Sequence, residues 1–251
     1  FIWSWALLRG TLPSIRRPTF TIMVAANTGL DCCIVWLERT SKPQRSEVFV
    51  FDLKAGRRKA ALDALFDARP DKAPMPQLKH CISFLLLSPN GRHIFSTIPD
   101  QPNEVRVHSA DTGELITAKQ VPGVPVVCAL SPDGSLFAWL CQDGLVSICD
   151  SKLTGKQEAK KTRCARPRPG GFCFVGNRSL AMVVDQETID LIDKNTMKVA
   201  RSFQVRGKHV NCIAGSMDGR FLAAGYGLSG RTIGGFAVWD TDTGKLVKEI
   251  Q

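Results

Sequence analysis

Three glycines, Gly225, Gly227 and Gly230, have the spacing G-x-G-x-x-G, which can form a loop around the phosphates of a dinucleotide. That chemistry requires the loop to follow a strand and to open a helix, because the N-terminus of the helix holds the pyrophosphate. The residues that follow, RTIGGFAVWD, contain no helix start and are typical of another strand. We therefore interpret the glycines as part of a hairpin, and the sequence predicts no cofactor and no small-molecule substrate.

The four histidines and nine cysteines show no spacing that points to a metal site or a catalytic group. Cys32 and Cys33 are adjacent, no C-x-x-C occurs, and most other cysteines lie in apolar runs, where cysteine packs as a small core residue. H-x-x-x-H, G-x-S-x-G and P-loop sequences are absent as well. We predict no catalytic or metal-binding residues, a protein that is not an enzyme, and a reducing, cytoplasmic location because the cysteine count is odd.

Basic residues outnumber acidic residues by 33 to 23, and the formal net charge of +10 favours acidic partners. The densest basic run, residues 156–168, has six basic residues and one acid, Glu158. Because Pro167 and Pro169 limit regular structure there, we expect an exposed connection that is either a solvated loop or a docking arm for phosphates or an acidic protein. The candidate partner-binding residues are Lys156, Lys160, Lys161, Arg163, Arg166 and Arg168, with Arg39, Lys42, Arg45 and Arg231 in other predicted connections.

The chain contains repeated segments, and these must form the framework that positions the candidate residues. The turn sequences SPNG (88–91), SPDG (131–134) and SMDG (216–219) each lie between two apolar runs. A second kind of segment, found five times, alternates apolar and polar residues and ends in a turn. Aligning the five gives a column of Phe51, His108, Cys149, Ile192 and Trp239, followed by a column of Asp52, Ser109, Asp150, Asp193 and Asp240.

Each repeat predicts four antiparallel strands. Alternating segments of this length are typical of half-buried strands, and Asn-Gly and Asp-Gly supply the positive φ angles of tight hairpins. The recurring aspartate can accept amide hydrogen bonds within its own turn. We therefore assign structural roles, not catalytic ones, to Trp239, Asp240, Gly244, Asp52, Asp150, Asp193, Gly91, Gly134 and Gly219. Since one such sheet cannot hide both faces, sheets stacked around an axis are expected, which is an all-β propeller.

The segment VWDTDTGKL (238–246), the three S-x-[DN]-G turns and their apolar lead-ins resemble the WD-repeat (WD40) family over about residues 19–251. Only Trp239-Asp240 keeps the Trp-Asp pair, and the Gly-His dipeptide of the family is absent, so the resemblance is to a divergent member. It implies a β-propeller of four-stranded blades with units near 19–66, 80–120, 124–160, 170–205 and 208–251. Five units could close alone or form part of a larger propeller, with residues 1–18 as an extension or a partial blade.

The apolar run FIWSWALL at residues 1–8 is far shorter than a membrane span, and no other segment approaches that length, so no membrane span is predicted. The resemblance and the lack of catalytic spacing predict a non-catalytic scaffold or adaptor of a cytosolic multiprotein assembly, whose partner has an acidic surface. The alternative is a subunit of an RNA–protein particle that contacts phosphates through basic loops. A propeller enzyme is a minor alternative.

Overall fold

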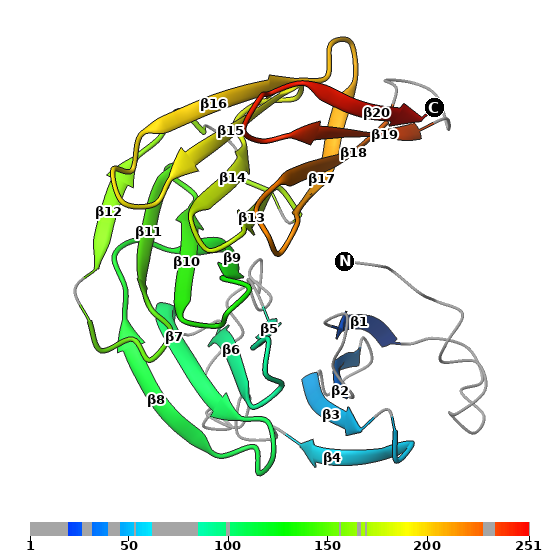
Figure 1. Cartoon of the computed structure of the whole chain (residues 1–251). Helices are drawn as coiled ribbons and strands as arrows, with labels where there is room; N and C mark the ends of the chain where they lie inside the picture. The colour runs from blue at the N-terminus through cyan, green and yellow to red at the C-terminus, as the bar shows by residue number, and fades with distance from the viewer. Residues whose placement is uncertain are drawn as a thin grey trace. The chain divides into compact units, whose positions relative to one another are not determined.

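The computed structural model describes residues 20–26, 32–39, 46–52, 54–61, 85–98, 101–155, 157–164, 167–168, 170–227 and 234–250. These residues form five four-stranded antiparallel sheets (Figure 1). The prediction of an all-β fold built of four-stranded blades is confirmed. None of the described residues belongs to a helix long and apolar enough to cross a membrane. Residues 1–18, the predicted extension or partial blade, lie outside the described part.

The chain divides into two compact units, Phe1–Gln120 and Val121–Gln251. The first unit contains two sheets. One consists of β1 (Phe20–Ala26), β2 (Cys32–Arg39), β3 (Ser46–Asp52) and β4 (Arg57–Ala61). The other consists of β5 (Leu85–Leu87), β6 (His93–Ile98), β7 (Gln101–Ser109) and β8 (Leu115–Gln120). The second unit contains three sheets. The first consists of β9 (Pro125–Leu130), β10 (Leu136–Cys141), β11 (Leu145–Asp150) and β12 (Glu158–Lys161). The next consists of β13 (Phe172–Val175), β14 (Ser179–Val183), β15 (Thr188–Asp193) and β16 (Val199–Gln204), and the last of β17 (His209–Gly215), β18 (Phe221–Gly227), β19 (Gly234–Asp240) and β20 (Leu246–Ile250).

Each sheet is a meander in which consecutive strands pair, so the order along the sheet is the order in the chain. Gly225 and Gly227 lie within β18, and β18 pairs with β19 in the register Gly225↔Phe236 and Gly227↔Gly234. This arrangement is the hairpin that the sequence predicts. Gly225 and Gly227 thus lie in one strand of an antiparallel pair, while Gly230 lies outside the described residues.

The turn between the third and fourth strands is held by the recurring aspartate. Asp240 accepts hydrogen bonds from the backbone N and the hydroxyl of Thr243, both at 2.8 Å, and Asp193 does the same for Thr196 at 2.8 and 2.9 Å. The amide of Thr243 is the main reason why the pKa of Asp240 is below its ordinary value. Gly244 closes the turn with a φ of 73°, and Met197 takes the equivalent position with a φ of 53°.

Glycines close the turns between first and second strands in the same way. Gly91, Gly134 and Gly219 have φ angles of 69°, 72° and 79°, a region that residues with a side chain rarely adopt. In each turn the glycine N donates to the carbonyl oxygen of the serine three residues earlier. The S-x-[DN]-G sequences are therefore hairpin turns.

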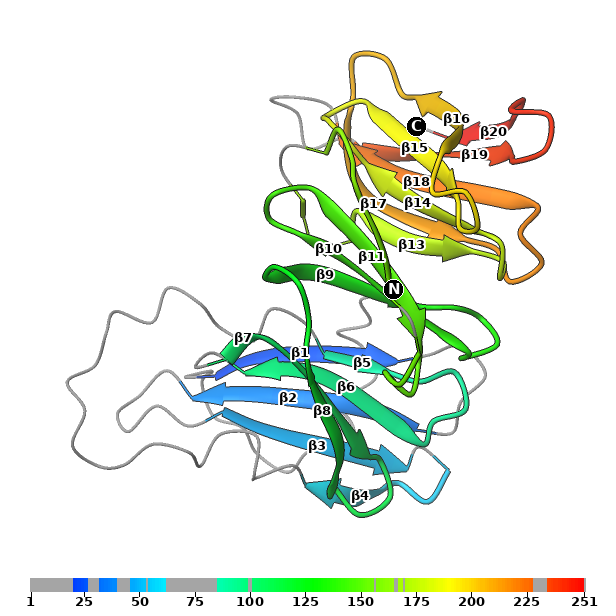
Figure 2. The same ribbon diagram turned by 90° about the vertical axis from the view of Figure 1, so that its left-hand side faces the viewer.

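The two cores of the second unit lie between neighbouring sheets. The β13–β16 sheet lies between the other two sheets of the unit (Figure 2). One core joins residues such as Ala138 and Leu140 of β10 to Leu180 of β14, and the other joins Leu191 of β15 to Trp239 of β19. Trp239 is buried, and its ring lies 5.5 Å from that of Phe203.

The first strands of neighbouring sheets approach each other closely. A Cβ atom on Gly215 of β17 would overlap the carbonyl oxygen of Phe174 and lie 2.7 Å from Cα of Val175, both on β13. Backbone hydrogen bonds cross the same junction, from Ile213 N to Gly170 O at 2.8 Å and from Gly176 N to Ser216 O at 3.0 Å. Glycine at this point lets the two backbones meet.

In the first unit, the column residue of β7 is a buried histidine. Nδ1 of His108 lies 3.2 Å from the carbonyl oxygen of Gly113 and donates to it, while Nε2 has no hydrogen-bond partner. Burial is the main cause that lowers the pKa of His108 below its ordinary value of 6.5. The folded chain therefore holds this imidazole neutral.

We expect Trp239→Ala to lower the free energy of unfolding by about 3–5 kcal/mol, because a buried aromatic ring leaves a cavity between two packed sheets. Urea denaturation followed by circular dichroism measures the loss. Met217→Ala is the control, since Met217 is 72% exposed on a turn and its truncation should change stability by no more than about 0.5 kcal/mol. Equal effects of the two substitutions would contradict the assignment of Trp239 to the core.

We expect stability to fall as the pH drops below the ordinary histidine value, because unfolded His108 binds a proton that the folded chain excludes. Above that value both states are neutral, and His108 contributes no pH dependence. His108→Gln should therefore flatten the loss of unfolding free energy between about pH 7 and about pH 5. The matched control is His93→Gln on β6, and a pH profile unchanged by His108→Gln would be the contrary result.

Candidate functional site

The basic run at residues 156–168 begins as a strand. Residues 158–161 form β12, which pairs with β11 in the register Leu145↔Lys161 and Ile148↔Glu158. The prediction that the whole run is a connection is wrong for these four residues. The strand EAKK shows no apolar alternation because it is the outermost strand of its sheet and all four of its residues are exposed.

Lys160 and Lys161 are the candidate residues that this strand presents to solvent. Both are exposed, and Nζ of Lys161 donates to Oδ2 of Asp143 at 2.9 Å. Both members of that ion pair are well exposed, so it contributes little to stability and leaves the lysine available to a partner. The two lysines thus form an exposed basic point on the outer edge of the β9–β12 sheet.

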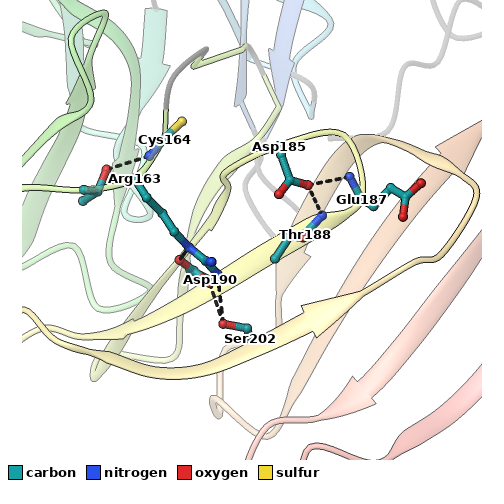
Figure 3. A network of polar contacts seen from close by, with 8 residues as sticks. Arg163, Cys164, Asp185, Glu187, Thr188, Asp190 and Ser202 are labelled. Carbon is teal, nitrogen blue, oxygen red and sulfur yellow. Dashed lines mark hydrogen bonds and ion pairs between the residues drawn. The ribbon is translucent and has the colours of Figure 1, made fainter.

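Arg163 is engaged in the fold. Its guanidinium reaches from the connection after β12 to Asp190 on β15, with Nε donating to Oδ2 at 2.6 Å and Nη2 donating to Oδ1 (Figure 3). Ser202 on β16 completes the cluster, since its hydroxyl donates to Oδ1 of Asp190 at 2.6 Å and lies 3.2 Å from Nη2 of Arg163. The hydrogen bond to Asp190 raises the pKa of Arg163 further above its ordinary value.

The carboxylate of this cluster lies inside the sheet interface. The side chain of Asp190 is 0% exposed, whereas 58% of the Arg163 side chain is exposed. A buried carboxylate is costly unless it is paired and hydrogen-bonded, and Arg163 and Ser202 supply those partners. The connection between the β9–β12 and β13–β16 sheets is therefore fastened by a bidentate ion pair.

The residues beside Arg163 fix the path of the connection. Thr162 donates to the carbonyl oxygen of Gly144 through its backbone N at 3.0 Å and its hydroxyl at 2.8 Å. Cys164 is buried, and its thiol lies 3.3 Å from the carbonyl oxygen of Val183, which it reaches as a hydrogen-bond donor. Arg163 is thus presented toward Asp190 by fixed neighbours on both sides.

Arg168 also belongs to the framework. Its Nη1 donates to the carbonyl oxygen of Val210 at 3.2 Å and its Nη2 to that of Asp185 at 3.3 Å, so it bridges the β13–β16 and β17–β20 sheets. The turn at Asp185 is held by amide hydrogen bonds from Glu187 and Thr188 at 2.8 and 2.7 Å (Figure 3). Burial acts to raise the pKa of Asp185, but these hydrogen bonds outweigh it and the pKa is lowered.

Six further basic residues were predicted as candidates for partner binding. Arg39 is the last residue of β2, in the first unit. The remaining five, Lys156, Arg166, Lys42, Arg45 and Arg231, lie outside the described residues.

The described part of the chain holds no metal-binding cluster, and burial makes three of its cysteine thiols poor nucleophiles. No group of three or more histidine, cysteine or acidic side chains in it is placed to hold a metal ion. Burial raises the pKa of the Cys141 thiol to about 11 and that of Cys173 to about 12, so both stay protonated and unreactive near neutral pH. Cys128 is shifted in the same direction by the same cause.

Asp190 and Ser202 were not among the predicted site residues. The sequence does mark Asp190 as unusual, since this acid interrupts the apolar residues of TIDLID three residues before the recurring Asp193. An acid inside a strand that packs on both faces needs a cation. Nothing in the sequence near it says which of the basic residues that cation is.

No known family model matches the chain, and no curated protein matches it. Solved structures do. Hydrazine synthase of Kuenenia stuttgartiensis is 19% identical over 71% of this chain and 52% of its own, with a TM-score of 0.56. A structure of U3-55K and a crystal structure of RRP9 WD40 repeats each share 14% identity over 69% of this chain and 52% of theirs, with a TM-score of 0.54.

The chain therefore has the β-propeller fold of WD40 repeats, and the predicted resemblance is confirmed for the fold. It spans about half the length of the solved chains that it matches. One of those chains is named as an enzyme and another as a set of WD40 repeats, so the fold alone does not separate a catalyst from an interaction module.

We expect Arg163→Ala to lower the free energy of unfolding by about 2–3 kcal/mol, because it leaves a buried carboxylate with only Ser202 as a partner. This expected loss of stability is smaller than for a fully buried ion pair, because the guanidinium of Arg163 is partly exposed to solvent. Urea denaturation of the single variants and of Arg163→Ala/Asp190→Ala gives the coupling between the two residues.

In the Asp190→Ala background the loss of Arg163 should cost less than about 1 kcal/mol, since no buried charge is then stranded. Strictly additive effects of the two substitutions would contradict the interaction. Lys160→Ala serves as the matched control, because it removes a cation from the same segment without touching Asp190.

Proposed function

We propose that this chain is a non-catalytic interaction scaffold of a multiprotein assembly in the cytosol. The observation that carries the proposal is that the recurring ionisable residues are hydrogen-bonded into the framework. Asp150, Asp193 and Asp240 each accept amide hydrogen bonds from their own turn. What remains for a partner is the exposed surface of turns and edge strands, and propellers of this type use such surfaces to hold other proteins.

The exposed lysines of β12 favour a partner with an acidic surface. Lys160 and Lys161 project from an edge strand, and the chain as a whole carries a net charge of +10. A field of this sign draws an acidic protein face toward the sheet edge and speeds association more than it tightens the complex.

An RNA partner is less well supported by the described residues. Phosphate binding needs cations that are free to turn toward the backbone, and Arg163 and Arg168 are already bonded to Asp190 and to carbonyl oxygens. The basic run also lacks aromatic side chains on which bases could stack. We therefore propose a protein partner for this surface.

We expect Lys160→Glu/Lys161→Glu to weaken capture of the partner about tenfold at low salt without lowering the melting temperature, because both side chains are exposed on the edge of the sheet. Quantitative mass spectrometry of proteins retained from cytosol compares the variant with the parent. Lys198→Glu/Lys245→Glu, which makes the same charge change at two exposed turn positions, is the control. Retention that drops equally for both variants would show a general charge effect and overturn the assignment to β12.

The RNA alternative is tested by its dependence on salt. If the chain binds RNA through phosphates, the affinity for a single-stranded RNA should fall by orders of magnitude between about 50 and about 200 mM salt. The scaffold proposal expects no measurable RNA binding in this range. Tight, steeply salt-dependent RNA binding that Lys160→Glu/Lys161→Glu abolishes would contradict the scaffold proposal. It would support a subunit of an RNA–protein particle instead.

A further inference from the structure

The second unit contains a cleft between two of its sheets. It has a volume of about 200 Å³ and lies between the β9–β12 and β13–β16 sheets, beside the turns of the recurring aspartates. Leu136 and Ile148 form its apolar wall. The polar residues that line it are Asp150, Glu158, Lys194 and Asn195.

The next interface of the same unit is closed at this place by an arginine. Arg201 of β16 reaches from its own sheet to the turn after β19, where Nη2 donates to the carbonyl oxygen of Asp242 at 2.7 Å and Nη1 to that of Thr243 at 3.3 Å. The guanidinium lies so close to this turn that a Cβ atom on Gly244 would be 2.5 Å from Nη1. A guanidinium thus joins the β13–β16 sheet to the β17–β20 sheet.

Glu158 of β12 occupies the position that corresponds to Arg201. Each residue lies eight positions after the recurring aspartate of its sheet and pairs with the residue two positions before that aspartate, as Ile148↔Glu158 and Leu191↔Arg201 show. The chain therefore places a carboxylate where the next interface has a guanidinium. Because a carboxylate cannot donate to a carbonyl oxygen, the contact that Arg201 makes has no counterpart at the cleft.

The acceptors that a guanidinium would use are present at the cleft. Asn195 corresponds to Asp242, since each is the second residue after its recurring aspartate, and no described residue donates a hydrogen bond to the carbonyl oxygen of Asn195. The side chain of Glu158 is exposed and has no ion pair with a described residue. Met197, which stands where the next sheet has Gly244, is buried in the core between the two sheets and does not line the cleft.

The charges around the cleft favour a cation. Two carboxylates, Asp150 and Glu158, line it together with one ammonium, that of Lys194. Lys194 is itself within electrostatic reach of the carboxylates of Asp133 and Asp193. A guanidinium suits this lining better than an ammonium, because its planar fork can donate to a carboxylate and a carbonyl oxygen together while its stem covers apolar surface.

We propose that this cleft binds an arginine side chain of a partner protein. The guanidinium donates to the carboxylate of Glu158 and to the carbonyl oxygen of Asn195, and its stem packs against the apolar wall. The site goes beyond the proposed scaffold function, since it recognises one type of side chain and does not depend on an acidic surface drawn to the exposed lysines of β12.

Titration of the isotope-labelled chain with the end-blocked peptide Gly-Gly-Arg-Gly-Gly, followed by NMR, tests the proposal. The amide signals of Glu158 and Asn195 should shift with a dissociation constant in about the millimolar range, because a single side chain in a small cleft supplies little free energy. The same peptide with citrulline in place of arginine has nearly the same shape without the charge, and it should bind at least about tenfold more weakly. The lysine peptide should also bind more weakly than the arginine peptide, because an ammonium lacks the planar fork.

Two substitutions at one position separate the site from a general charge effect. Glu158→Gln should weaken binding of the arginine peptide at least about tenfold. Glu158→Arg should fill the cleft from within, as Arg201 does in the next interface, so it should abolish binding and raise the melting temperature. Glu187→Gln, which removes the same charge from the turn between β14 and β15, is the matched control and should bind as the parent does.

Three results would overturn the proposal. They are equal binding of the arginine and citrulline peptides, equal binding of the arginine and lysine peptides, and arginine binding that Glu158→Gln leaves unchanged. Capture of an acidic partner is measured separately with the β12 lysine variant, so the failure of one contact can be told from the failure of the other.

Discussion

The structure depends on the need of each four-stranded sheet to cover two apolar faces. A sheet whose third strand reads FAVWD or TIDLID has apolar residues on both sides, and neither side can remain in water without a large loss of free energy. Stacking sheets face to face meets this need repeatedly, with the column residues Ile192 and Trp239 buried at successive interfaces. The turns, the glycines and the ion pairs all act within the geometry that this stacking sets.

Asp190 departs from the rule that apolar residues fill the interface. At the equivalent position of β19 the residue is Ala237, which packs without any polar partner. In β15 the carboxylate obliges the preceding connection to bring a cation, and Arg163 is the residue that arrives. A run of basic residues that looks like a docking arm in the sequence therefore has a divided role. Lys160 and Lys161 face solvent, while Arg163 and Arg168 hold neighbouring sheets together.

The sequence predicts the local features of the fold well because they are encoded locally. The hairpin turns at SPNG, SPDG and SMDG and the turns after Asp193 and Asp240 are found where the sequence predicts them, since the turn residues mark them directly. The sequence did not predict β12, because an edge strand that is exposed on both faces shows no alternation of apolar and polar residues. The partner of Asp190 escaped prediction for another reason, because Arg163 lies 27 residues away and only the packing of two sheets brings it near.

The close approach at Gly215 has a consequence for how successive sheets are oriented. The first strands β13 and β17 touch through backbone atoms, whereas farther out the third and fourth strands are held apart by the rings of Trp239 and Phe203. Two sheets that meet along one edge and are wedged open along the other must rotate relative to each other. The volume of the side chains between two sheets, from the first strands to the fourth, thus fixes the angle between one sheet and the next. A bulkier residue at 215, or a smaller one at 203, changes that angle, so the number of sheets that fit in a full turn is encoded in residue size.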